Sequence, residues 1–203
     1  INNNATLTDI TLENCTSLSL INCPKVQKII INNGTDTGKP QFKSFIFDAQ
    51  DINKVETGFK LSNGANIKNT KPGVVDLSFC NQLKSLSIRN SYTTKVILPN
   101  DENIHIELPE YAFANNLYDF IGFSGNASLY ITGQSTFQNC PRLNLFQVND
   151  DNSVNKNAPL NLYINSTCTS LASTFACNSK HTGEIMTFDQ AKSFLEKCTE
   201  ECV

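Results

Sequence analysis

The chain has two histidines that could take part in acid–base or metal chemistry, His105 and His181. His105 lies in the alternating segment Ile104-His105-Ile106-Glu107-Leu108, so on a strand it shares the polar face with Glu107. This pair would suit a general base with a carboxylate neighbour, or two ligands of a metal ion. Because side chains two apart on a strand diverge, we favour a solvated strand face. His181 lies in a polar, glycine-containing segment and is expected to be exposed.

Cysteines are the other residues whose side chains could bind a metal or form covalent bonds. Four of the eight lie near the C-terminal end of the chain: Cys168, Cys177, Cys198 and Cys202. Four thiolates could bind zinc, but no C-x2-C pair is present, and this many cysteines in a chain of this size favours disulfides in an oxidising compartment. Three pairings are open, and Cys198 is not expected to pair with Cys202 if both lie on one continuous helix. Cys15 and Cys23 are candidates for a further bridge.

The remaining oxygen-rich cluster is Asn149-Asp150-Asp151-Asn152. It lacks the ligand spacing of an EF-hand and the glycine pattern of calcium-binding repeats, so a solvated loop is favoured. We therefore predict no metal, no cofactor and no enzymatic activity.

Three segments share one template, in which apolar residues flank a cysteine at fixed spacing. They are Leu20-Cys23-Val26-Ile29-Ile31, Leu77-Cys80-Leu83-Leu86-Ile88 and Phe137-Cys140-Leu143-Phe146-Val148. Repetition of this kind is typical of a solenoid, in which the repeated positions build the core. We expect the template cysteines to point inward, and equivalent positions of successive coils to stack.

The segments between the template copies also predict strands. Alternating apolar residues occur around Phe45, Leu61, Val96, Leu129 and Leu162, separated by turn residues. Residues 187–198 instead place apolar side chains at helical spacing, with Thr187 as a plausible N-cap. A helix tied by disulfides would cap the open end of a solenoid.

Composition excludes several classes of partner. The net charge is −3 and the pI is about 5.4, with no basic patch to bind nucleic acid. No apolar run approaches the length needed to span a bilayer. The sequence begins at Ile1 without Met, which predicts a processed or excised chain.

Asparagine is unusually frequent, with 27 copies. Asparagine adopts left-handed turn conformations readily, as a repeat with tight turns requires, although a biased genome would give the same excess. Five glycosylation sequons occur, at Asn4, Asn14, Asn33, Asn126 and Asn165, close to the number expected by chance. Asn33 and Asn126 lie in polar turns and are the better candidates, whereas Asn14 precedes Cys15.

The template resembles that of leucine-rich-repeat proteins, in particular the BspA-like (treponemal-type) subfamily. That subfamily repeats A-F-x-x-C-x-x-L-x-x-I-x-I, and the strongest match runs from Ser135 to Leu143 and on to Phe146 and Val148. The resemblance implies a secreted or cell-surface protein used in adhesion or recognition. A parallel β-helix or a Cys-rich β-solenoid of another family is the alternative.

We therefore predict a mainly β, or α/β, right-handed solenoid of irregular leucine-rich-repeat type. Residues 1–165 would form the solenoid, and residues 166–203 a disulfide-bonded, Cys-rich helical cap of the same domain. The predicted function is non-enzymatic recognition or adhesion outside the cell, with a protein or glycan bound on the solenoid face. The alternative is a structural subunit that assembles with copies of itself, head to tail, into a filament or surface layer.

Overall fold

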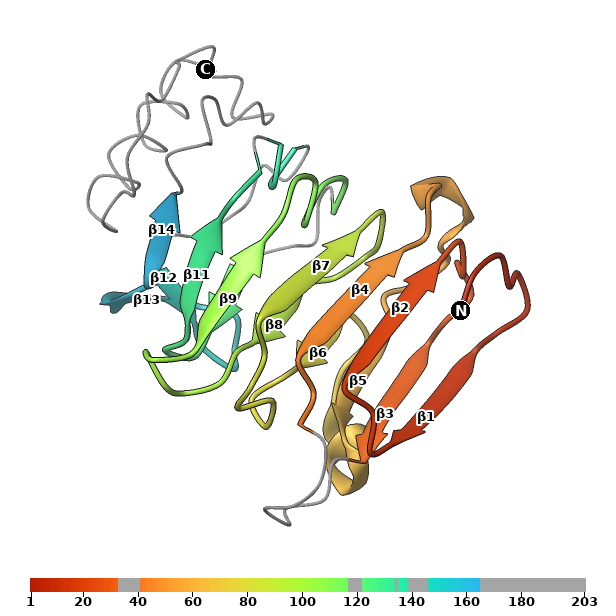
Figure 1. Ribbon diagram of the computed structural model, residues 1–203, viewed down its shortest axis with the longest axis horizontal. Coiled ribbons are helices and arrows are strands. Elements are labelled where there is room, and N and C mark those ends of the chain that lie inside the picture. Colours follow the sequence, from red (N-terminus) through yellow and green to blue (C-terminus); the bar gives the residue numbers. More distant parts are fainter. Residues whose placement is uncertain (33–40, 117–121, 134, 139–145, 165–203) are drawn as a thin grey trace.

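The computed structural model describes residues 1–32, 41–116, 122–133, 135–138 and 146–164. Within these ranges the regular structure is mostly β-strand, and the helices are two short 3-10 segments, η1 (Ile52–Lys54) and η2 (Gly64–Asn69). The strands follow one another along the long axis of the molecule, from the N-terminal strands at one end to β14 at the other (Figure 1).

Twelve strands form two sheets of six, and all paired neighbours within them are parallel. Sheet A contains, in spatial order, β2 (Ser17–Ile21), β4 (Ser44–Asp48), β7 (Ser85–Arg89), β9 (His105–Leu108), β11 (Ser128–Ile131) and β14 (Leu162–Ile164). Sheet B contains β1 (Asp9–Glu13), β3 (Lys28–Asn32), β5 (Lys60–Asn63), β6 (Val74–Asp76), β8 (Lys95–Ile97) and β10 (Gly122–Ser124). From β1 to β11 the chain alternates between the sheets, except that β5 and β6 both join sheet B.

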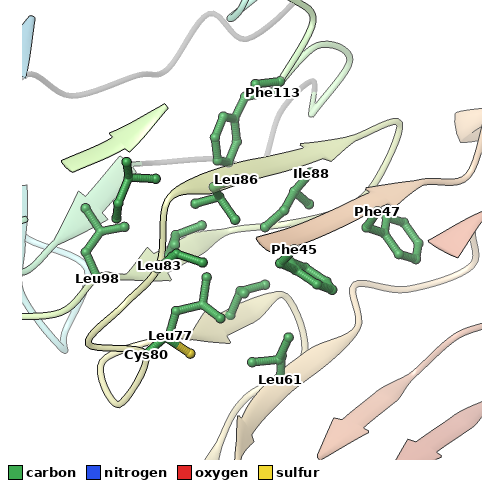
Figure 2. Packing of buried hydrophobic residues seen from close by; sticks show 14 of the residues in the cluster. Phe45, Phe47, Leu61, Leu77, Cys80, Leu83, Leu86, Ile88, Leu98 and Phe113 are labelled. Atoms are coloured by element: carbon green, nitrogen blue, oxygen red, sulfur yellow. The ribbon is translucent and has the colours of Figure 1, made fainter. Parts of the chain in front are cut away.

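The core lies between the two sheets and is built from in-register columns of apolar side chains. In sheet A, Phe45 pairs with Leu86 and Phe47 with Ile88, and all four are buried. In Figure 2, Phe45, Leu86 and Ile88 lie on the side of sheet A that faces Leu61 of sheet B. Alternation along each strand sends one set of side chains into this core and leaves the other set on the outer face. The predicted strands around Phe45, Leu61, Val96, Leu129 and Leu162 are thus confirmed.

The cysteine template proves to be a corner motif. Cys23 lies between β2 of sheet A and β3 of sheet B, whereas Cys80 lies between β6 of sheet B and β7 of sheet A. Both thiols are buried, as expected. The expectation that template positions stack in equivalent coils is wrong for this pair, because one spacing serves to turn the chain at both edges of the core.

Turn positions account for part of the asparagine content. Eight non-glycine residues of the described part have positive φ, and six of them are asparagine: Asn3, Asn14, Asn22, Asn90, Asn115 and Asn152. Two pairs of them bond to each other between segments far apart in the sequence: Asn22 donates to Asn3 over 2.8 Å, and Asn115 donates to Asn90 over 2.8 Å. The left-handed backbone and the side-chain ladder both favour asparagine at these positions.

An antiparallel pair, β12 (Phe146–Val148) and β13 (Val154–Pro159), lies beside β10. The oxygen-rich loop 149–152 lies between β12 and β13 and binds the ammonium group of Lys95. Lys95 belongs to sheet B, and its side chain is only 4% exposed. Lys95 Nζ donates to the carbonyl of Asn149 over 3.0 Å and to Asp150 Oδ1 over 3.2 Å. The loop therefore binds a cation of the protein itself.

Several predictions fall outside the described residues. They are the cap of residues 166–203 with its helix over 187–198, the cysteines Cys140, Cys168, Cys177, Cys198 and Cys202, the sequons at Asn33 and Asn165, and His181.

Candidate functional site

The outer face of sheet A carries a column of aromatic side chains near its C-terminal end. The rings of Tyr130 (β11) and Tyr163 (β14) stack with centroids 4.8 Å apart and planes 14° apart. The His105 ring of β9 lies 5.0 Å from the Tyr130 ring. We call these three residues the aromatic ladder. It arises because Tyr130 and Tyr163 are direct partners in the parallel register, one strand spacing apart.

Beside the ladder the outer face is hollowed into an open groove of about 660 Å³. One wall is the segment Asn81–Lys84 that precedes β7, and the other is formed by β9 and β11. The residues that line it are Asn81, Gln82, Leu83, Lys84, Asn103, Ile104, His105, Glu107, Tyr130 and Thr132. We call it the sheet A groove.

The groove combines aromatic rings with charged side chains of both signs. Lys84 and Glu107 are both exposed, and the Glu107 amide donates to the Lys84 carbonyl over 2.8 Å, which joins the strands that carry them. Burial raises the pKa of the Tyr130 phenol, and the neighbouring Tyr163 phenol raises it further. Tyr130 is therefore a neutral hydroxyl at physiological pH, able to donate as well as accept a hydrogen bond.

His105 and Glu107 are both exposed on one face of β9, as alternation predicted. Among the described residues no hydrogen bond joins the His105 imidazole to the Glu107 carboxylate, and the contact that His105 makes is with the Tyr130 ring. The described residues also contain no group of three or more His, Cys, Asp or Glu side chains that could hold a metal ion.

Two of the three described cysteines, Cys23 and Cys80, are buried in the core, and Cys15 is half-buried. Cys15, Cys23 and Cys80 are free thiols in the structure, and the bridge between Cys15 and Cys23 stays a prediction. Cys23 Sγ lies 3.5 Å from the carbonyl oxygen of Ile21. Burial raises the pKa of the Cys80 thiol, and the nearby Asp76 carboxylate acts in the same direction. Cys80 is therefore held as the unreactive thiol.

The described sequons differ in how far their asparagines are committed to the fold. Asn126 Nδ2 donates to Asn100 over 2.6 Å, and its Oδ1 accepts from Gln147 over 2.8 Å. The hydroxyl of the sequon residue Ser128 is directed to the Glu102 carbonyl over 2.8 Å. Asn14, in contrast, is exposed on a left-handed turn, and the half-buried Asn4 uses only its Oδ1 in the described hydrogen bonds. Glycosylation stays a prediction, and these contacts make Asn126 a poorer candidate than its turn sequence indicated.

No protein-family model, curated protein or solved structure matches this chain. The resemblance to leucine-rich-repeat proteins therefore stays a prediction. In the described part of the chain, no helix is long and apolar enough to cross a membrane.

Sequence reasoning found His105 and Glu107 but missed Tyr130 and Tyr163. A signal was present, because the tripeptide Leu-Tyr-Ile occurs twice, at 129–131 and 162–164, and the two copies pair residue for residue. Identical tripeptides in neighbouring parallel strands place identical side chains side by side, and here those on the outer face are tyrosines.

Proposed function

We propose that this chain is an extracellular recognition module that binds a protein or glycan on the outer face of sheet A, without catalysing a reaction. The observation that carries the proposal is the aromatic ladder beside the sheet A groove. Tyrosine is enriched among the residues that dominate binding energies, because it offers a large contact area and a polar tip.

The ladder is also ordered before a partner arrives. Tyr130 and Tyr163 restrict each other by stacking, and their strands are fixed by the parallel register. Little side-chain entropy is lost when such rings are covered, so more of the contact energy is retained as affinity. The exposed Lys84 and Glu107 at the groove supply charges that would orient a partner.

We further infer that the alternating strands form a solenoid with two strands in most coils. Two parallel sheets support the β-solenoid alternative, whereas the leucine-rich-repeat assignment, the right-handed winding and the C-terminal cap stay predictions. The cysteine content supports a location outside the cell.

Assembly into a filament is the weaker proposal. Strand β1, at one edge of sheet B, has exposed acidic residues at both ends, Asp9 and Glu13. Charges on an edge strand discourage the addition of a further strand.

The test compares binding of the purified chain to a panel of immobilised polysaccharides and extracellular-matrix proteins. The variant replaces Tyr130 and Tyr163 with serine, a residue already present on the outer face at Ser19 and Ser85. A matched control, Ile46→Ser, removes a half-buried apolar side chain of β4 from the same face. We expect at least one partner to bind, with about tenfold lower affinity for the double variant and unchanged affinity for the control. Wild-type affinity of the double variant for every bound partner would refute the proposal.

A further inference from the structure

A second hollow, of about 380 Å³, lies where the strands of sheet A end. Its central residues are Asp48, the last residue of β4, and Arg89, the last residue of β7, which pair in the parallel register. Tyr111, Asn115 and Gln138 from the following coils complete its lining. It shares no lining residue with the sheet A groove. We call it the Arg89 pocket.

Arg89 is held in place by a buried carboxylate. Its Nε donates to Asp48 Oδ2 over 2.8 Å, and the Asp48 side chain is 5% exposed while that of Arg89 is 36% exposed. Asp48 also accepts hydrogen bonds from the backbone N–H of Gln50 over 2.8 Å and from the side-chain Nδ2 of Asn90 over 2.7 Å. Three hydrogen-bond donors thus stabilise the buried carboxylate of Asp48.

The guanidinium has donors left over for a ligand. Of its five N–H groups only the one on Nε has a partner among the described residues. The remaining groups lie on the two terminal nitrogens of a side chain that lines the pocket. A planar fork of this kind matches the two oxygens of a carboxylate.

The other lining residues suit the hydroxyl groups and the ring of a sugar that carries a carboxylate. The pocket also holds the side-chain amides of Gln50 and Gln138, which can both donate to and accept from hydroxyl groups. Tyr111 is 39% exposed and has a φ of 59°, a left-handed conformation that is rare for an aromatic residue. The lining of this polar pocket therefore includes an exposed aromatic residue on a strained backbone, and an aromatic ring can pack on the C–H face of a sugar.

We propose that the Arg89 pocket binds the carboxylate-bearing ring of an acidic sugar, a uronate. Arg89 receives the carboxylate, the amides receive the hydroxyl groups, and Tyr111 packs on the ring. Asp48 is a positioning residue, because it fixes Arg89 and lies beneath it. The site would give the protein selectivity for acidic over neutral polysaccharides, independently of the sheet A groove.

The experiment titrates the protein with methyl β-D-glucuronide and with methyl β-D-glucoside, which differ only in the carboxylate. Affinity and the Arg89 Nε–H signal are followed by NMR. We expect millimolar binding of the glucuronide, about tenfold weaker binding of the glucoside, and weakening of the glucuronide complex by salt. Equal binding of the two sugars, or no binding of the glucuronide, would overturn the proposal.

Three variants locate the site. Arg89→Gln should reduce glucuronide affinity to the glucoside level, and Lys43→Gln, which removes one charge at the opposite end of β4, should leave it unchanged. Tyr111→Asn removes the ring but keeps a residue that tolerates positive φ, so the variant should fold and bind both sugars several-fold less tightly. Glucuronide binding that survives Arg89→Gln, or that falls equally in Lys43→Gln, would place the site elsewhere.

Discussion

Replacing Asp48 with alanine tests whether the corner of sheet A is held by one buried carboxylate. The Asp48 side chain is 5% exposed and accepts hydrogen bonds from the backbone N–H of Gln50, from Arg89 Nε and from the side-chain Nδ2 of Asn90. In the alanine variant these three donors lose their common acceptor. The cavity left by the carboxylate is small, so the lost hydrogen bonds dominate the change in stability.

The magnitude follows from the exposure of each donor. A buried hydrogen bond to a charged group contributes about 1.5–3 kcal/mol, but exposed donors regain most of that from water. Arg89 is 36% exposed, so we assign its ion pair no more than about 1 kcal/mol. The two remaining bonds, from the exposed Gln50 and the half-buried Asn90, bring the expected cost of Asp48→Ala to about 3 kcal/mol. Asp48→Asn keeps one acceptor oxygen and should cost about half as much.

The assay is equilibrium unfolding in urea, followed by far-ultraviolet circular dichroism. The double variant Asp48→Ala/Arg89→Ala completes a cycle that isolates the ion pair, for which we expect a coupling of about 1 kcal/mol or less. A loss below about 1 kcal/mol for Asp48→Ala would show that water satisfies the freed donors, and the corner would then be held by the backbone alone.

Four further predictions concern the core and the corners. Phe47→Ala should lower the free energy of unfolding by about 3–5 kcal/mol in the same urea assay, because its fully buried ring packs on Phe59 at 4.5 Å. Cys80 should resist iodoacetamide in the folded protein while the half-buried Cys15 reacts, and faster labelling of Cys80 would contradict its burial. Folding raises the pKa of the Cys80 thiol. The stability that Cys80 contributes is therefore complete below the pKa of an unfolded-state thiol, about 8.5, and declines as the pH rises above that value. Urea unfolding at pH 7 and at pH 10 would measure this decline. Gly125→Ala should destabilise by about 2 kcal/mol or more, since φ is +96° and a Cβ would lie 2.3 Å from the Leu98 carbonyl oxygen; a melting temperature equal to that of wild type would show that the turn can shift.

The sequence determined the strands and the direction in which their side chains point. Alternation around Phe45 and Leu86 is a local property, so it could be read without knowing which strands are neighbours. The same reasoning placed His105 and Glu107 together on an outer face. The left-handed role of asparagine followed from its side chain, and it is confirmed because six of the eight described non-glycine residues with positive φ are asparagine.

Only the tertiary structure decided which strands are neighbours. The cysteine template serves two different corners because a spacing fixes a turn but not the sheet that follows it. Tyr130 and Tyr163 are 33 positions apart in the sequence and become stacked only through the parallel register of β11 and β14. Asp48 and Arg89 likewise meet across β4 and β7. In a parallel sheet the partners of a residue come from other coils, so the sites on the outer face depend on register, which local sequence does not encode.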